Sequence, residues 1–188
     1  MIRAEDTDRN LVVDILARAF DDNLSVNYMV RQDIKRTQRI KYLMEYSFDV
    51  CKDSGEVFLS EDKTGCALVL LPDQRRTNLK SVLLDIKLVA LCLGFSNLKK
   101  TLSREAKIKN LHPEHIYHVW FLGVDPAKQN KGTGSRLLSE LLRDGRSRQR
   151  TICLETSTLK NIPWYEKFGF HIYNELDLGY RLYLMKQE

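Results

Sequence analysis

Two glycines between a buried strand and a helix mark the first place where this sequence could do chemistry. Residues 116–124 are β-branched and aromatic, which suits a buried strand. Gly132 and Gly134 follow, and glycine lets the backbone approach a ligand and point successive N–H groups in one direction. The helix expected next presents unpaired amides and the positive end of its dipole. The pattern therefore predicts that residues 129–135 bind a pyrophosphate.

The loop does not carry the patterns of the two commonest nucleotide-binding loops. Neither GxxxxGK[ST] nor GxGxxG is present. Gln129, Gly132 and Gly134 instead match the Q/R-x-x-G-x-G/A signature of GNAT-type N-acetyltransferases. A second segment, NIPWYEKFGF at residues 161–170, resembles another segment of that family in the expected order. The resemblance covers residues 115–186 well and the N-terminal half only loosely.

The resemblance implies acetyl-CoA as the acyl donor and no metal. Backbone groups of Leu122, Gly123 and Val124 would bond the pantetheine arm, and one of those amides would polarise the thioester oxygen. Asn161 would bond the pantetheine or a nearby backbone group, although a helix cap is an alternative role. The residues expected to hold the pyrophosphate are Gln129, Asn130, Lys131, Gly132, Thr133, Gly134 and Ser135.

Tyr165 is the expected proton donor. A departing thiolate belongs to a thiol with a pKa of about 8.5, and a tyrosine with a pKa of about 10 is protonated at neutral pH. In the family that the segment around Tyr165 resembles, the tyrosine at this place points at the thioester sulfur. The alternative role is an aromatic ring that packs its helix onto the sheet.

Two residues compete for the role of general base. An alkylammonium, with a pKa of about 10.4, must lose a proton before it can attack. Glu155, at the end of a strand, could accept that proton directly or through water, and His118 is the rival. Without a bulge, His118, Trp120 and Leu122 share one strand face, so Trp120 could stack on an acceptor. Ordered water alone is a further alternative. The other histidines have no metal-ligand spacing: His112, His115 and His171.

The acceptor is expected to be the primary amine of a small molecule. In the GNAT fold that the resemblance implies, the first two helices and their joining loop commonly form one wall of the acceptor cleft. Tyr28 and Asp22 in the polar segment 21–28 are therefore candidate acceptor contacts, with a simple capping loop as the alternative. A protein or peptide N-acetyltransferase and a non-catalytic acyl-CoA-binding module are the alternative functions.

The elements around these residues predict an α/β fold of the GNAT type. We expect a central, mixed, twisted sheet of about six to seven strands, flanked by helices. Residues 1–188 would form a single domain, with a helical insertion at about 77–112 folded over the sheet or the substrate mouth. The expected strands are 1–4, 56–60, 66–71, 116–124, 151–155, 170–177 and 180–185. The expected helices begin after residue 8, near 33, at 79, at 97, after 134 and at 161.

Composition sets broad limits on the kind of protein. A share of 43% hydrophobic and 29% charged residues is ordinary for a globular domain. The net charge of +5 suits an anionic partner such as coenzyme A. The basic residues are dispersed without a stacking-aromatic array, so no nucleic acid is expected. No apolar leader or span suggests a membrane, and four scattered cysteines favour reduced, buried thiols. We expect a cytoplasmic monomer or homodimer.

Overall fold

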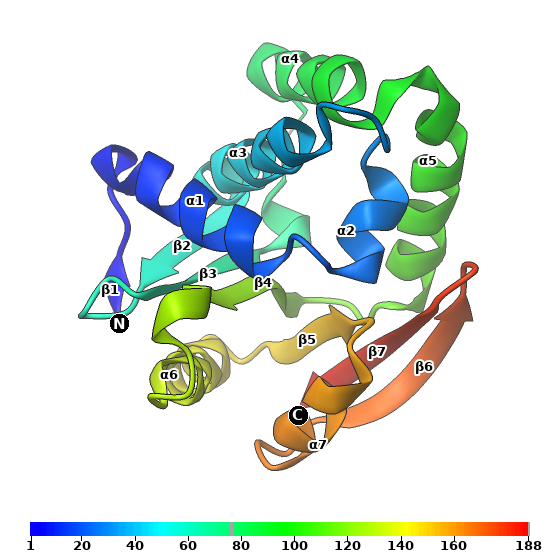
Figure 1. Cartoon of the computed structure of the whole chain (residues 1–188). Helices are drawn as coiled ribbons and strands as arrows, with labels where there is room; N and C mark the ends of the chain where they lie inside the picture. The colour runs from blue at the N-terminus through cyan, green and yellow to red at the C-terminus, as the bar shows by residue number, and fades with distance from the viewer. Residues whose placement is uncertain (76, 188) are drawn as a thin grey trace.

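A seven-stranded mixed sheet forms the centre of the molecule (Figure 1). The computed structural model describes residues 1–75 and 77–187, and the side chains of residues 95 and 96 lie outside that description. The strand order is β1-β2-β3-β4-β5-β7-β6, and only β4 and β5 pair in parallel. The predicted α/β class is confirmed. The strands are β1 (Ile2–Arg3), β2 (Gly55–Leu59), β3 (Gly65–Leu70), β4 (Ile116–Val124), β5 (Thr151–Thr156), β6 (His171–Asp177) and β7 (Arg181–Gln187).

Helices cover both faces of this sheet. The α-helices are α1 (Arg9–Ala19), α2 (Leu24–Met29), α3 (Arg36–Ser54), α4 (Leu79–Leu88), α5 (Gly94–Leu111), α6 (Thr133–Ser147) and α7 (Ile162–Glu166). Shorter helical turns are Asp6–Asp8, Pro72–Gln74, Val89–Leu93, Pro126–Lys128 and Leu159–Asn161. One apolar core joins α1 and α3 to the sheet, and a second joins α6 and α7 to the opposite face. The predicted helix after Gly134 is α6, and its four periodic leucines are buried: Leu137, Leu138, Leu141 and Leu142.

The helical insertion lies between the third and fourth strands, as predicted, but its first helix does not cover the sheet. No residue of α4 is buried. Instead α4 lies against α3, where the Tyr46 hydroxyl donates to Asp85 over 2.7 Å. Leu84 and Leu88 pack at the margin of the α1–α3 core, which leaves the other apolar side chains of α4 exposed. α5 then passes α2 and approaches the hairpin between β6 and β7 (Figure 1).

The N-terminal third differs from the sequence prediction in local detail. The segment expected to be a loop contains α2, whose cap Asn23 accepts the Val26 amide over 3.1 Å. The helix expected near residue 33 begins at Arg36. Asp8 is the N-cap residue of α1, but its carboxylate accepts from the Glu5 amide and Lys63 instead of capping that helix. These short polar choices compete locally, which is why apolar periodicity missed them.

Two further observations bear on the expected setting. None of the described helices has the length and hydropathy needed to cross a membrane. The four cysteines are free and buried, as predicted. Burial raises the pKa of the Cys153 thiol to about 12, with the nearby Glu155 carboxylate adding to the effect. That thiol is therefore neutral at physiological pH.

Candidate active site

The loop before α6 has the form of an anion cradle. Gly132 is the N-cap residue of α6 and has a φ of 78°, in the left-handed region that favours glycine. Asn130 also lies in that region, with a φ of 64°. Within the described chain, the backbone amides of residues 129–135 donate no hydrogen bond to a loop carbonyl or a capping side chain. These amides can bind an anion at the helix start, so the loop fits the diphosphate of coenzyme A.

A cation that the sequence analysis missed stands beside the loop. The Arg136 guanidinium donates to the Lys131 carbonyl and to the Thr133 hydroxyl, each over 3.3 Å. Arg136 is exposed and one turn into α6, so it adds positive charge to the helix end. Its place at the fourth position after Gly132 is the signal that a helical-wheel argument could have used. Lys131, which sequence analysis did name, is also exposed.

The sheet divides next to this loop. β4 and β5 pair only between Ile116–His118 and Thr151–Cys153. Beyond that last pair, residues 119–124 of β4 and 154–156 of β5 find no strand partner across the seam in the described chain. We call this opening the fork, and the two halves of the sheet are separated there in Figure 1. The predicted pantetheine contacts Leu122, Gly123 and Val124 therefore lie on the open edge of β4.

A bulge in β4 sets which side chains face each side of the fork. The β3–β4 register skips Trp120, since Leu68 pairs with Phe121 and Val69 with Val119. His118 and Trp120 therefore face the α1–α3 side, with ring centroids 6.5 Å apart, whereas Leu122 packs on the α6 side. The expectation that all three share a face held only without a bulge, and the extra residue at Trp120 reverses the alternation before Leu122.

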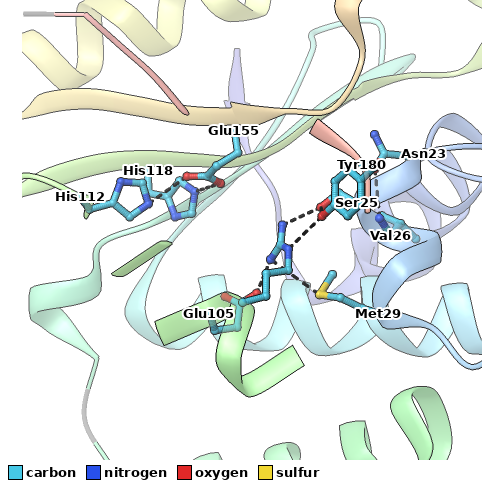
Figure 2. Close-up of polar contacts among 10 residues, drawn as sticks. Asn23, Ser25, Val26, Met29, Glu105, His112, His118, Glu155 and Tyr180 are labelled. Carbon is cyan, nitrogen blue, oxygen red and sulfur yellow. Dashed lines mark hydrogen bonds and ion pairs between the residues drawn. The ribbon is translucent and has the colours of Figure 1, made fainter. Parts of the chain in front are cut away.

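The two candidate bases form one cluster at the fork. The Nε2 atom of His118 lies 2.9 Å from Oε2 of Glu155, and both side chains are 9% exposed (Figure 2). His118 forms the last paired position of the seam, and Glu155 follows its partner Cys153 by two residues. The two residues predicted as alternative bases, Glu155 and His118, therefore lie in one site. Nδ1 of His118 has no hydrogen-bond partner in the described residues.

A third member of the cluster is His112, for which sequence spacing gave no signal. Its Nε2 lies 2.9 Å from Oε1 of Glu155, an ion-pair contact without the alignment of a hydrogen bond. Its Nδ1 lies 3.0 Å from the Tyr173 hydroxyl on β6. Burial acts to raise the pKa of Glu155, but the electrostatic attraction of His118 and the contacts of both imidazoles with its two oxygens outweigh burial. The pKa of this carboxyl is therefore held well below its usual range.

The same cluster has the ligand types of a metal site. The three ligand atoms of His112, His118 and Glu155 lie within 4.8 Å of one another. Two imidazole nitrogens and one carboxylate oxygen are ligands that Zn²⁺ accepts. The sequence-based expectation of no metal is untested by this arrangement. Acid–base chemistry is the use that these atoms support through the contacts present.

Tyr165 lies on the opposite face of the sheet from that cluster. Its ring packs against Trp164 and Phe170, with centroids 4.8 and 5.8 Å away. Burial raises the pKa of Tyr165 to about 12, so the phenol is protonated at neutral pH. The indole of Trp164 donates to the Ser135 hydroxyl over 3.2 Å, which joins α7 to the start of α6. Tyr165 thus stands near the anion loop, on the α6 side of the fork.

The other predicted site residues lie in less distinctive surroundings. Asn161 is the N-cap residue of α7, but its side chain makes no capping hydrogen bond. Tyr28 packs against Tyr180 with centroids 5.3 Å apart, and the Lys100 ammonium lies 4.6 Å from its ring centroid. Asp22 is exposed beside α2. Tyr28 lies on the α1–α3 side of the sheet, beside α5.

The chain resembles known acetyltransferases in sequence and fold. Residues 86–172 match the family model of the acetyltransferase (GNAT) domain. A histone acetyltransferase HPA2 and related acetyltransferase from Corynebacterium glutamicum superposes with a TM-score of 0.72 at 18% identity, covering 98% of this chain and 93% of that one. The C-terminal condensation domain of Ebony, in complex with beta-alanyl-dopamine, gives 0.68 at 14%, covering 100% and 97%. Arylalkylamine N-acetyltransferase 2 from Aedes aegypti gives 0.63 at 16%, covering 99% and 96%. At these identities, the structures are evidence of a common fold.

Proposed function

We propose that this chain is a GNAT-type acetyltransferase that transfers the acetyl group of acetyl-CoA to the primary amine of a small molecule, and the acetyltransferase (GNAT) model matched by residues 86–172 supports the proposal. The observation that carries the proposal is the fork, with free loop amides on one side and a buried base cluster on the other. Acetyl-CoA would supply an activated thioester. A ternary complex would align amine and thioester across the fork, and such alignment is worth on the order of 7 kcal/mol or more.

Donor binding is assigned to backbone groups. The amides of residues 129–135 and the exposed guanidinium of Arg136 would hold the diphosphate. The open edge of β4 near Leu122, Gly123 and Val124 would bond the pantetheine arm. One of these amides would also stabilise negative charge on the carbonyl oxygen, because a fixed N–H dipole needs no reorganisation during reaction.

Proton removal from the acceptor is assigned to His118. With Nε2–H donating to Glu155, the lone pair on Nδ1 is available to an ammonium group in the acceptor cleft. Glu155 would hold the imidazole in this tautomer and stabilise the cation that forms after proton transfer. His112 would act as a positioning residue by holding the other carboxylate oxygen. Trp120, beside His118, would form part of the acceptor wall.

Proton return is assigned to Tyr165. A phenol whose pKa is raised to about 12 is protonated at neutral pH and carries the proton that the leaving group needs. Tyr165 would donate this proton as the carbon–sulfur bond breaks, and the tyrosinate would then regain a proton from solvent, while His118 releases to solvent the proton taken from the amine. Free CoA and the N-acetylated amine are then released. Asn161 remains a candidate pantetheine contact near the start of α7.

The finer parts of the proposal concern the acceptor and the setting. An amine acceptor agrees with the arylalkylamine and beta-alanyl-dopamine named for two similar structures. Acetylation of a protein amine agrees with the histone acetyltransferase among them and is the alternative. A non-catalytic acyl-CoA-binding module would retain the loop without a use for the His118–Glu155 pair. A cytoplasmic monomer or homodimer completes the proposal, and the four free cysteines support a reducing compartment.

The test is a screen of amines for release of free CoA thiol, paired with a thermal-shift titration of acetyl-CoA. A ligand that binds only the folded protein at 100 times its Kd stabilises it by about 2.7 kcal/mol, so the melting temperature should rise. Thiol release that requires both acetyl-CoA and an amine would support transferase activity. A thermal shift without transfer to any small amine or peptide would favour the binding module. The absence of both a thermal shift and thiol release at millimolar acetyl-CoA would refute the proposal.

A further inference from the structure

A hollow on the acceptor side of the molecule collects positive charge. It lies between α5, α2 and the β6–β7 turn and has a volume of about 400 Å³. Its lining includes four basic side chains from one face of α5, namely Lys99, Lys100, Arg104 and Lys107, and no acidic one. Lys99 and Lys107 are exposed and form no ion pair with the described residues. We call this feature the basic hollow.

Arg104 anchors the floor of the basic hollow. The residue is only 6% exposed, and its guanidinium donates to the Ser25 hydroxyl over 2.6 Å and to the Tyr180 hydroxyl over 3.2 Å. Figure 2 shows Ser25 and Tyr180 side by side opposite the His118–Glu155 pair. Glu105 is the one carboxylate that contacts Arg104 in the described chain, and its side chain is half exposed at the rim.

The basic hollow and the base cluster belong to one region. Figure 2 shows the Arg104 partners Ser25 and Tyr180 in the same close-up as the His118–Glu155 pair. Burial acts to lower the pKa of Arg104, and the carboxylates of Glu105 and Glu155 act in the opposite direction. Tyr28, a predicted acceptor contact, lines the hollow and carries the Lys100 ammonium over its ring. A molecule that presents an amine to His118 would therefore have its far end in a strongly positive field.

Building on the proposed function, we propose that the acceptor is a small amine that also carries an anionic group, a carboxylate or a phosphate, which binds in the basic hollow. Guanidinium and ammonium groups donate charge-assisted hydrogen bonds to such oxygens. Packing does not explain why the lysines gather here, because Lys99 and Lys107 are exposed, and only the half-buried Lys100 has a packing contact, with the Tyr28 ring. The anion would fix the orientation of the acceptor, and the amine would then point toward the fork.

The experiment compares matched pairs of acceptors that differ only in the anionic group. O-phosphoethanolamine is compared with ethanolamine, and β-alanine with n-propylamine, in the thiol-release assay with acetyl-CoA. We expect at least one anionic member to have a KM about tenfold below that of its neutral twin, since one favourable charge contact is worth about that factor. Equal KM values in both pairs would overturn the inference.

Variants of the exposed lysines locate the effect without disturbing Arg104, which joins three elements. Lys99→Gln with Lys107→Gln should raise KM for the anionic acceptor about tenfold and leave its neutral twin unchanged. Lys109→Gln with Lys160→Gln removes the same charge from exposed positions outside the hollow and is the control. An equal rise in the control pair would show a general charge effect and contradict the proposal.

Inorganic phosphate distinguishes an anionic acceptor from a separate anionic ligand. Phosphate should inhibit competitively against the anionic acceptor and lose this effect in the Lys99–Lys107 variant. Phosphate that binds without competing with any acceptor would assign the hollow to another anion and overturn the inference. Transfer to neutral amines without any anionic preference would refute this inference alone. Absence of transfer to every amine would instead refute the proposed function.

Discussion

The two sides of the fork are built from different materials. On the α6 side, the expected contacts are backbone amides of one continuous segment, residues 129–135, and one adjacent strand edge. On the α2–α5 side, the groups are side chains from distant parts of the chain: Ser25, Arg104, His112, His118, Glu155 and Tyr180. One side presents fixed dipoles, whereas the other presents titratable groups whose charge depends on their neighbours.

This difference separates general binding from selectivity. Backbone amides recognise a diphosphate through geometry, so most side-chain changes along the loop should be tolerated except where the backbone needs glycine. A cluster such as His112–His118–Glu155 works only when every partner is present, because an unpaired buried charge is costly. We therefore expect substitutions in the base cluster and at Tyr165 to change turnover, and substitutions in the anion-binding segment to change cofactor affinity.

The largest expected effect is on the acceptor side. Glu155→Gln should lower kcat by about 10²- to 10⁴-fold, the usual contribution of acid–base catalysis, with little change in acetyl-CoA affinity. Steady-state kinetics and calorimetric titration measure the two quantities. His118→Gln should lower kcat by a similar factor. Testing both variants keeps the prediction falsifiable if one of them has a folding defect. Glu166→Gln, at an exposed position on α7, is the control. Full turnover in both variants would remove the cluster from the mechanism.

The next effect tests the donor side of the same reaction. Tyr165→Phe keeps the packing against Trp164 and Phe170 but removes the phenolic proton. We expect kcat to fall by about 10²-fold, at the lower end for proton transfer because a thiolate is a modest base. Cofactor affinity should be unchanged. Tyr183→Phe on β7 serves as the control, and equal turnover in the wild type and Tyr165→Phe would show that the ring only packs.

A smaller effect distinguishes Gly132 from a glycine outside the loop. Gly132→Ala places a side chain at a φ of 78°, which costs about 1–2 kcal/mol and should weaken acetyl-CoA binding by about tenfold. At saturating cofactor, kcat should be unchanged. Gly179→Ala is the matched control, because it imposes the same backbone strain at a φ of 83° in the β6–β7 turn, away from the cradle, with nothing within 4 Å of the added carbon. Equal affinities for both variants and the wild type would contradict a backbone-built cradle.

The smallest effect concerns pH. The pKa of Glu155 is lowered on folding, so its contribution to stability is present above its ordinary value of 4.5 and is lost as pH falls below it. The melting temperature of the wild type should therefore exceed that of Glu155→Gln near neutrality, and this difference should shrink below about pH 4.5. Scanning calorimetry between pH 3 and 8 measures it. A difference that stays constant with pH would mean that the carboxylate is not charge-stabilised.

The sequence predicted the donor side in detail because that side is local. The β4 bounds and the loop before α6 agree with the structure, since apolar runs and glycines act on their own neighbours. His112 and Arg104 were not predicted as site residues, because their partners are distant in sequence. His112 lies in a connecting segment and contacts Glu155 of β5. Arg104 lies on a basic helix face and donates to Tyr180. The Trp120 bulge was also beyond periodicity, because one inserted residue depends on pairing with β3. The site roles themselves stay predictions.

The fork also has a consequence for local hydrogen exchange of the backbone. The β4–β5 backbone hydrogen bonds stop after His118. The peptide groups of β4 that face the fork beyond this point therefore lack the hydrogen bonds that protect neighbouring strands from exchange. Deuterium should exchange early at those amides of residues 119–124 that face the fork and not β3 in the unliganded protein, and late once pantetheine supplies the absent partners. The donor would then act as a temporary eighth strand, and its departure after each turnover would reopen the sheet.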